Sequence, residues 1–295
     1  MSIAPLVGCG TALVTPFTAT GALDEPALRS FVDWQIDEGI DFLVPCGSTG
    51  ESATMSVAEN RRVVEIVAEQ ARGRVPVVAG ASSNDTQKAI ALSLELREAG
   101  ATHLLHAAPM YSKPPQRGIA LHFRSIADAV DLPIVLYNVP SRTACNVEAS
   151  TTLELAAHPN ITSIKEASGL LPQVTDILVR RPDGFTVLSG DDEITVPILA
   201  LGGDGLISVV SNVVPRAMTE LVRKGRDGDF SGAREIHLRL LPWLRAAFVE
   251  TNPIPVKAAL AMMGRMENVL RSPLVSLDER HADVVRDALL RAGVL

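Results

Sequence analysis

The sequence predicts an α/β fold in which eight parallel strands close into a (β/α)₈ barrel with a C-terminal helical extension. Short β-branched or apolar runs alternate with amphipathic segments, and this alternation repeats eight times along the chain. None of the runs is followed by a Gly-x-Gly-x-x-Gly turn, which favours a closed barrel over a doubly wound sheet. A chain of 295 residues with 47% hydrophobic residues can also bury the large core that a barrel needs.

The predicted strands are punctuated by Gly, Pro, Ser and Thr, as strands commonly are. They are Gly10–Val14, Phe42–Pro45, Val75–Ala79, His103–Ala107, Ile134–Tyr137, Ile161–Lys165, Thr186–Leu188 and Leu206–Val210. After Val214 the strand signals cease and helical patterns continue to the end. We therefore expect a catalytic barrel over residues 1–224 and a helical extension over residues 225–295.

The helices between the first strands carry clear start and stop signals. The segment 24–38 begins with an Asp cap and has Pro26 in its first turn. Ser56 followed by Glu59 forms a capping box. Asp85 caps the next helix, which Gly100 ends.

Composition excludes several classes of function. The net charge is −7 and the chain has no run of Lys or Arg, so neither a nucleic acid nor a membrane is an expected partner. The three cysteines form no Cys-x-x-Cys pair, which argues against disulfides and structural zinc and agrees with a reducing cytoplasm. The apolar stretch 194–214 is interrupted by Pro197 and three glycines, so we do not expect a membrane span.

Lys165 is the first candidate for chemistry, because it ends a predicted strand. Barrel active sites are built from residues at the carboxyl ends of the strands. Side chains alternate along the strand, so Lys165 shares a face with Ser163, and burial of that face would favour the neutral amine that attacks a carbonyl. The alternative is a lysine that extends into solvent from the strand end. None of the other four lysines ends a predicted strand.

Both tyrosines of the chain, Tyr111 and Tyr137, lie at or just after a predicted strand. A phenol can pass a proton between a substrate oxygen and solvent, although either tyrosine could equally be a buried aromatic residue.

Arg142 follows the same strand as Tyr137 and could bind a carboxylate through two parallel hydrogen bonds. The Gly-rich turn 47–52 precedes a capped helix, and its amides could bind an anion.

Metal and phosphate sites are not expected. His103 and His106 are three residues apart on a strand, so they should point to opposite faces. No His-Glu-x-x-His motif or Walker-type loop is present. Asp191 and Asp192 could bind a cation, but we interpret them as a helix N-cap.

Eight segments together resemble the dihydrodipicolinate synthase family, in the order and spacing of that family and over nearly the whole chain. They are GTALVTPF at 10–17, GSTGES at 47–52, PMYSKPPQRG at 109–118, YNVPSRT at 137–143, IKEASG at 164–169, LSGDD at 188–192, GLISVVSNV at 205–213 and NPIPVK at 252–257. The resemblance implies a class I aldolase-type lyase that condenses pyruvate with L-aspartate 4-semialdehyde to 4-hydroxy-tetrahydrodipicolinate, in the synthesis of diaminopimelate and lysine.

The resemblance also implies a role for each matching residue. Lys165 would form the pyruvate imine, with no other cofactor and no metal. Tyr137, Ser48 and Tyr111 would relay protons, and a neighbouring subunit of a homotetramer built from dimers would supply Tyr111. The remaining matches would bind substrate: Thr49 the pyruvate carboxylate, Arg142 the carboxylate of the aldehyde, and Gly190 and Ile207 the walls of the pyruvate pocket.

Three alternatives to this function stay open at this point. Ser48 stands where the synthases usually have Thr, and the related N-acetylneuraminate lyases have Ser, so a paralogous lyase or dehydratase acting on a sialic-acid-like or keto-sugar-acid substrate is the main alternative. The segment around Arg142 is more similar to the synthases. A non-catalytic keto-acid sensor would be expected to lack the lysine, a tyrosine or the arginine. A scaffold acting through its C-terminal helices would expose an apolar stripe.

In the family, a lysine feedback site uses two histidines, a glutamate and a tyrosine. The matching positions here are Val57, Asn60, Lys88 and Met110, while Asn84 is kept. A lysine in place of the acid would repel the ammonium group of an incoming lysine. We therefore expect weak or absent inhibition by lysine.

Overall fold

The computed structural model describes residues 5–295 and contains the predicted barrel. Its strands are β1 (Gly8–Ala12), β2 (Phe42–Val44), β3 (Val78–Gly80), β4 (His103–Ala107), β5 (Ile134–Asn138), β6 (Ile161–Glu166), β7 (Thr186–Ser189) and β8 (Gly205–Ser208). All pair in parallel, in the order β2-β1-β8-β7-β6-β5-β4-β3. A parallel bridge between Leu43 and Val77 joins β2 to the segment before β3, so the barrel is nearly closed.

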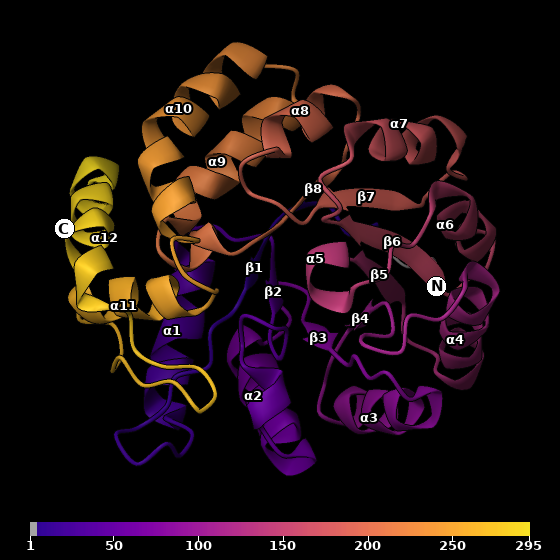
Figure 1. Ribbon diagram of the computed structural model, residues 1–295, viewed down its shortest axis with the longest axis horizontal. Helices are drawn as coiled ribbons and strands as arrows, with labels where there is room; N and C mark the ends of the chain where they lie inside the picture. Colours follow the sequence, from indigo (N-terminus) through magenta and orange to yellow (C-terminus); the bar gives the residue numbers. More distant parts are fainter. Residues whose placement is uncertain (1–4) are drawn as a thin grey trace.

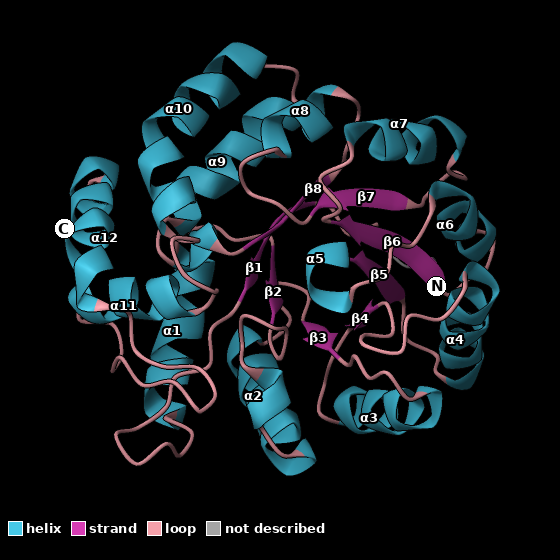
Figure 2. Cartoon of the chain, in the orientation of Figure 1, coloured by secondary structure: helices cyan, strands magenta, loops and turns pink. Residues whose placement is uncertain are grey.

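Helices surround these strands, as Figures 1 and 2 show. The helix that precedes or follows each strand packs outside the sheet, which is the arrangement that right-handed crossovers produce. These helices are α1 (Glu25–Asp37), α2 (Val57–Ala71), α3 (Thr86–Glu98), α4 (Gln116–Ala129), α6 (Ala149–Ala156), α7 (Leu171–Arg180), α8 (Thr195–Ala200) and α9 (Pro215–Arg226). The short helix α5 (Pro140–Thr143) is an exception, because it lies over the barrel opening in Figure 1.

The predicted helix caps are present. Asp24 accepts a hydrogen bond from the amide of Ala27, and Ser56 and Glu59 form the full capping box of α2. Asp85 accepts from the amide of Lys88 at the start of α3. These side chains satisfy amides that have no partner within their own helix.

Several strand boundaries differ from the prediction by one to three residues, and two of these differences have an identifiable reason. The strand predicted from Val75 begins only at Val78, because Pro76 has no amide hydrogen to give to the ladder. The strand predicted to reach Val210 ends at Ser208, where the amide of Val209 turns to the carboxylate of Asp192 at 3.0 Å.

The C-terminal residues are helical, as predicted. The helices are α10 (Phe230–Ala246), α11 (Ile254–Met262) and α12 (Glu279–Ala292), and α12 packs on both α10 and α11. The predicted boundary at residue 224 lies within the last turn of α9, a helix that packs against β1 and β8. None of the helices formed by residues 5–295 has the length and apolar character needed to cross a membrane.

Two apolar layers hold the barrel together. The inner layer fills the barrel with one side chain from most strands, and the outer layer lies between the strands and the helices. The inner layer comprises Leu6, Ala12, Phe42, Val44, Val78, Leu105, Val135, Leu188 and Ile207, with Tyr137 packed against it. The carboxyl ends of the strands remain open above this layer, and the candidate site lies there.

Candidate active site

Lys165 lies inside the barrel at the carboxyl end of β6. Ile164 packs in the outer layer, so the alternation along the strand turns Lys165 inward, and the residue is only 5% exposed. Tyr137 is its partner in the register of β5 with β6, and the Lys165 Nζ atom lies 4.3 Å from the centroid of that ring. The two residues predicted from the strand ends therefore lie side by side.

A pair of buried polar residues fixes these strand ends from the outside. Asn138 and Glu166 follow Tyr137 and Lys165 and face the opposite way. The Glu166 carboxylate accepts from Asn138 Nδ2 at 3.0 Å, from Gln173 Nε2 at 3.1 Å and from the Ser168 amide at 2.6 Å. These bonds hold β5 and β6 in the register that pairs the tyrosine with the lysine.

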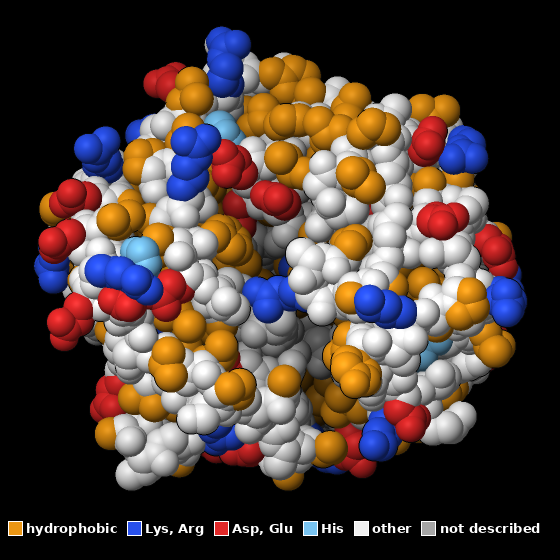
Figure 3. All heavy atoms as spheres, viewed as in Figure 1, with side chains coloured by type: hydrophobic (Ala, Val, Ile, Leu, Met, Phe, Trp, Pro, Cys, Tyr) orange, Lys and Arg blue, Asp and Glu red, His pale blue; other side chains and the backbone are white. Residues whose placement is uncertain are grey.

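Lys165 and Tyr137 line two adjoining cavities, of about 290 and 460 Å³. The inner cavity reaches into the barrel as far as Ala12 and Leu105, and the outer one opens toward the C-terminal helices. Figure 3 shows a hollow in the middle of this face, with charged side chains near it. The residues common to both cavities are Ser48, Thr49, Tyr137, Val139, Arg142 and Lys165. Five of these six were predicted from the sequence.

The loop that carries Ser48 and Thr49 is held in an unusual conformation. Cys46 and Glu51, at its two ends, have φ angles of 58° and 56°, a region that favours glycine. A side chain at Gly80 would meet the carbonyl oxygen of Cys46 at 2.2 Å, so the loop can approach β3 only because residue 80 is glycine. Strain of this kind persists only where the surroundings impose it, and it is common at functional sites.

Two amides of this loop are free to bind an anion. Within the described residues, the amides of Ser48 and Thr49 donate to no protein group, whereas those of Gly50 and Glu51 bond back to Gly47 and Ser48. Adjacent free amides at a tight turn form a concave site for a carboxylate. The predicted anion-binding loop is thus consistent with the geometry.

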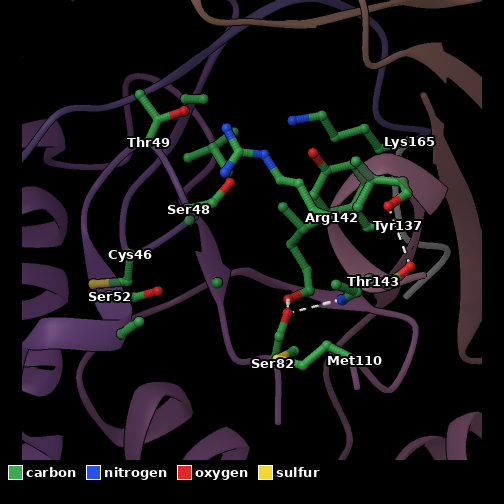
Figure 4. Close-up of a pocket in the computed structure, with 18 of the residues that line it drawn as sticks. Cys46, Ser48, Thr49, Ser52, Ser82, Met110, Tyr137, Arg142, Thr143 and Lys165 are labelled. Carbon is green, nitrogen blue, oxygen red and sulfur yellow. Dashed lines mark hydrogen bonds between the residues drawn. The ribbon is translucent and has the colours of Figure 1, made fainter. Parts of the chain in front are cut away.

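Arg142 reaches the same space from α5. Figure 4 shows its guanidinium and the Lys165 amine both pointing toward the loop of Ser48 and Thr49. The guanidinium is therefore placed to bind a second anionic group beside the lysine.

Of the other predicted residues, one lies at the site and two do not line it. Gly190 lines the outer cavity, and a Cβ atom there would lie 3.0 Å from the Lys165 Cγ atom, so glycine leaves room for the lysine. Ile207 is buried in the inner layer of the barrel. Tyr111 is 88% exposed, with a φ angle of 72°, and lines neither cavity of its own chain.

The interpretation of Asp191 and Asp192 as a helix N-cap was wrong. Helix α8 is preceded by Ile194, and its N-cap has no side-chain hydrogen bond. Asp192 is instead buried and accepts from Ser208 Oγ at 2.5 Å and from the Val209 amide. Burial raises the pKa of Asp192 to about 6, and these hydrogen bonds oppose that shift.

A set of contacts from the C-terminal segment was not predicted from the sequence. Asn252 Nδ2 lies 2.8 Å from Thr49 Oγ1, and Lys257 Nζ lies 2.5 Å from Glu51 Oε1. The backbone amide of Arg271 also donates to Glu51 at 3.0 Å. Lys257 is the only charged residue of α11, and a lone lysine in an apolar helix could have indicated a buried acidic partner.

Metal-binding groups do not assemble in the described part of the chain. No cluster of three or more His, Cys, Asp or Glu side chains is present among residues 5–295. His106 lies beneath α3, with Nε2 3.2 Å from Ser93 Oγ, while His103 lies on the other face of β4. The two histidines therefore point to opposite faces, as predicted.

Fold and site together define the class of protein: a (β/α)₈-barrel enzyme with a buried lysine in a pocket at the strand ends. The model of the dihydrodipicolinate synthetase family matches residues 5–292, and the chain belongs to this family. It is 51% identical to the 4-hydroxy-tetrahydrodipicolinate synthase of Koribacter versatilis, over 98% of this chain and 97% of that protein. Identity to the synthase of Nitratidesulfovibrio vulgaris (strain DP4) is 49%, over 98% and 99% of the two chains.

A solved structure gives the same result. The dihydrodipicolinate synthase of Acinetobacter baumannii, crystallised with pyruvate, superposes with a TM-score of 0.96 at 37% identity, over 98% of this chain and 99% of that one. The protein is accordingly a lyase, and these relatives support the synthase over the sugar-acid lyase as its activity.

Proposed function

We propose that this enzyme condenses pyruvate with L-aspartate 4-semialdehyde through an imine on Lys165. The observation that carries the proposal is the position of Lys165: it is buried at a strand end, beside Tyr137, and faces the free amides of the Ser48–Thr49 loop. An amine beside an anion-binding turn suits a substrate whose carbonyl carbon is next to a carboxylate, as in pyruvate.

Imine formation is the first step. The Lys165 amine attacks the C2 carbonyl of pyruvate, and loss of one water gives the imine. The amides of the loop and the hydroxyl of Thr49 bind the carboxylate, and Tyr137 and Ser48 carry the protons that the addition and the dehydration require.

The carbon–carbon bond forms next. The imine loses a methyl proton to give an enamine, whose carbon adds to the aldehyde of the second substrate. Arg142 binds the carboxylate of that substrate and so orients its aldehyde toward the enamine. The amine of the adduct then displaces Lys165, which closes the ring of 4-hydroxy-tetrahydrodipicolinate and frees the enzyme. No cofactor other than the covalently bound pyruvate takes part.

A second copy of the chain completes the proton relay in this proposal. Tyr111 is almost fully exposed, on a backbone with positive φ angles at Tyr111 and Lys113. An aromatic side chain held outward in this way suits insertion into a neighbouring subunit. We propose that Tyr111 serves the site of its neighbour within a dimer, and that two dimers form a homotetramer.

The test is a coupled assay with pyruvate and L-aspartate 4-semialdehyde, in which added dihydrodipicolinate reductase consumes NADPH. Borohydride with pyruvate should also leave a stable pyruvate adduct on Lys165, detected by peptide mass spectrometry. Lys113→Ala is a matched control, because Lys113 is an exposed loop lysine. A folded protein with an adduct on Lys165 but no turnover of the semialdehyde would reject this aldehyde partner. A folded protein without an adduct would reject the imine itself.

A further inference from the structure

Asn252 links the C-terminal segment to the candidate pyruvate site. It lies in the segment between α10 and α11, is 4% exposed and lines the outer cavity beside Thr49 and Arg142. Its side chain and its backbone contact different residues. The Nδ2 atom donates to Thr49 Oγ1 at 2.8 Å, and the carbonyl oxygen accepts from Arg142 Nη2 at 3.4 Å. One residue therefore contacts both side chains to which the proposed function assigns a substrate carboxylate.

The contact with Thr49 has a chemical consequence. A threonine hydroxyl has one hydrogen to donate and two lone pairs to accept with. The Asn252 amide occupies one lone pair and offers no acceptor to the hydroxyl through that contact. The hydroxyl hydrogen is therefore left for another acceptor, and a carboxylate bound at the adjacent free amides would be one.

We propose that Asn252 is a positioning residue that orients the Thr49 hydroxyl as a donor to the pyruvate carboxylate. The inference rests on the proposed function, since it assumes that Thr49 binds pyruvate. Asn252 does not touch the reacting atoms; it acts through Thr49 and, more weakly, through Arg142.

A second contact holds the Ser48–Thr49 loop against the C-terminal segment. Glu51 lies two residues after Thr49, and its carboxylate binds Lys257 and the amide of Arg271 from the C-terminal segment. Lys257 also donates to the carbonyl oxygen of Val269 at 2.7 Å. The loop is thus fixed to the C-terminal segment at both Thr49 and Glu51, which leaves the Asn252 amide little freedom to move away from the hydroxyl.

The experiment compares four variants with the wild type: Asn252→Ala, Asn252→Asp, Thr49→Val and the double variant Thr49→Val/Asn252→Ala. For each, the pyruvate concentration that gives half-maximal borohydride trapping on Lys165 is measured, together with kcat, the pyruvate KM and the melting temperature. Asn160→Ala is the structural control. Asn160 Nδ2 donates to the carbonyl oxygens of Ala127 and Val130, at the opposite end of β6 from Lys165.

Loss of one oriented hydrogen bond should raise the pyruvate half-saturation in Asn252→Ala by about 5- to 10-fold, with kcat changed by less than about twofold. Asn252→Asp keeps the size of the side chain, but its carboxylate accepts the Thr49 hydrogen and adds a negative charge. It should therefore raise the pyruvate half-saturation more than Asn252→Ala does. In the Thr49→Val background, Asn252→Ala should raise the pyruvate half-saturation little further, because the hydroxyl that Asn252 orients is absent. Asn160→Ala should lower the melting temperature and leave the pyruvate half-saturation unchanged.

Two results would overturn the role of Asn252 without affecting the proposed function. One is an unchanged pyruvate half-saturation in both Asn252 variants; the other is an equal increase in the wild-type and Thr49→Val backgrounds. If Asn252→Ala does not fold, the isosteric Asn252→Asp variant decides the first of these. A folded wild type that traps no pyruvate would instead reject the proposed function, and the role of Asn252 with it.

Discussion

Two lysines of this barrel are buried at the same end, and their surroundings differ. Lys257 is 0% exposed, and its amine is bound by the Glu51 carboxylate at 2.5 Å and the Val269 carbonyl oxygen at 2.7 Å. Lys165 is 5% exposed, forms no salt bridge within residues 5–295, and has the ring of Tyr137 as its near neighbour. One amine is fully engaged by the protein, and the other is left free to react.

The difference agrees with the role proposed for Lys165 and with a structural role for Lys257. Burial is the largest cause of the lowered pKa of Lys257, and the charge of Glu51 and its hydrogen bond oppose it. A paired amine of this kind stabilises the contact between two segments and has no lone pair to offer a substrate. A nucleophilic lysine must be buried without a permanent acidic partner, so that its neutral form can attack a carbonyl.

The largest effect that this comparison predicts is loss of activity in Lys165→Met. The variant removes the proposed nucleophile, so kcat in the coupled assay should fall by about 10⁴-fold or more. Its melting temperature should stay close to that of the wild type, because no buried partner loses its counter-charge. Activity within tenfold of the wild type in a pure preparation would assign the imine to another residue.

Lys257→Met should instead lower stability and leave the reaction on Lys165 in place. It leaves the Glu51 carboxylate buried without a counter-charge, which should lower the free energy of unfolding by about 3–5 kcal/mol. Urea denaturation measures this loss, and the residual folded protein should still trap pyruvate on Lys165.

The double variant Lys257→Met/Glu51→Gln isolates the unpaired charge as the cause. Glutamine keeps an acceptor for the Arg271 amide, so stability should recover by at least about 1 kcal/mol relative to Lys257→Met alone. Equal stability of the single and double variants would show that packing of the lysine stem, rather than its charge, holds α11 in place.

The same contrast explains which parts of the site could be predicted from the sequence. Lys165 and Tyr137 lie at strand ends and Arg142 follows one, and the carboxyl ends of parallel strands converge in any barrel. Their meeting therefore required only the strand pattern and its two-residue alternation. The resemblance to the family added Gly190 and the individual roles of the residues.

The contacts that were missed depend on the path of the chain after the barrel. Asn252 and Thr49 are separated by 203 positions, and Lys257 and Glu51 by 206. No local pattern specifies where the extension crosses the barrel opening, because that path is fixed by the packing of α10, α11 and α12. The pattern did predict that these segments are helical.

His106 is a third case, which pH can test: a buried base that has no acidic partner among residues 5–295. Burial, with a smaller contribution from the nearby His122, lowers the pKa of His106 from 6.5 to about 3. The folded protein therefore holds His106 neutral, so its contribution to stability is complete above pH 6.5 and is lost as the pH falls toward 3. Between pH 6.5 and 5 this loss should be about 2 kcal/mol of unfolding free energy.

Urea denaturation at pH 7.5, 6.5 and 5 measures that loss. His106→Gln should weaken the pH dependence in this window without abolishing it, because burial also lowers the pKa of His103 to about 4. His281→Gln, on the outer helix α12, should leave it unchanged. The same pH dependence in His106→Gln and the wild type would place the acid sensitivity in another group.

The smallest predicted effect concerns a third lysine, Lys88, which is exposed on α3. It stands where the resemblance places an acidic residue of the lysine feedback site, so its charge would repel the ammonium group of a bound lysine. Asn60, at another of those positions, already donates to the carbonyl oxygens of Ser52, Met55 and Ser56.

L-lysine at about 1 mM should therefore lower the rate of the coupled assay by less than about twofold. Lys88→Glu should increase the sensitivity, since it converts a repelled ammonium into an attracted one. An inhibition constant below about 1 mM in the wild type would show that the remaining residues bind lysine despite Lys88.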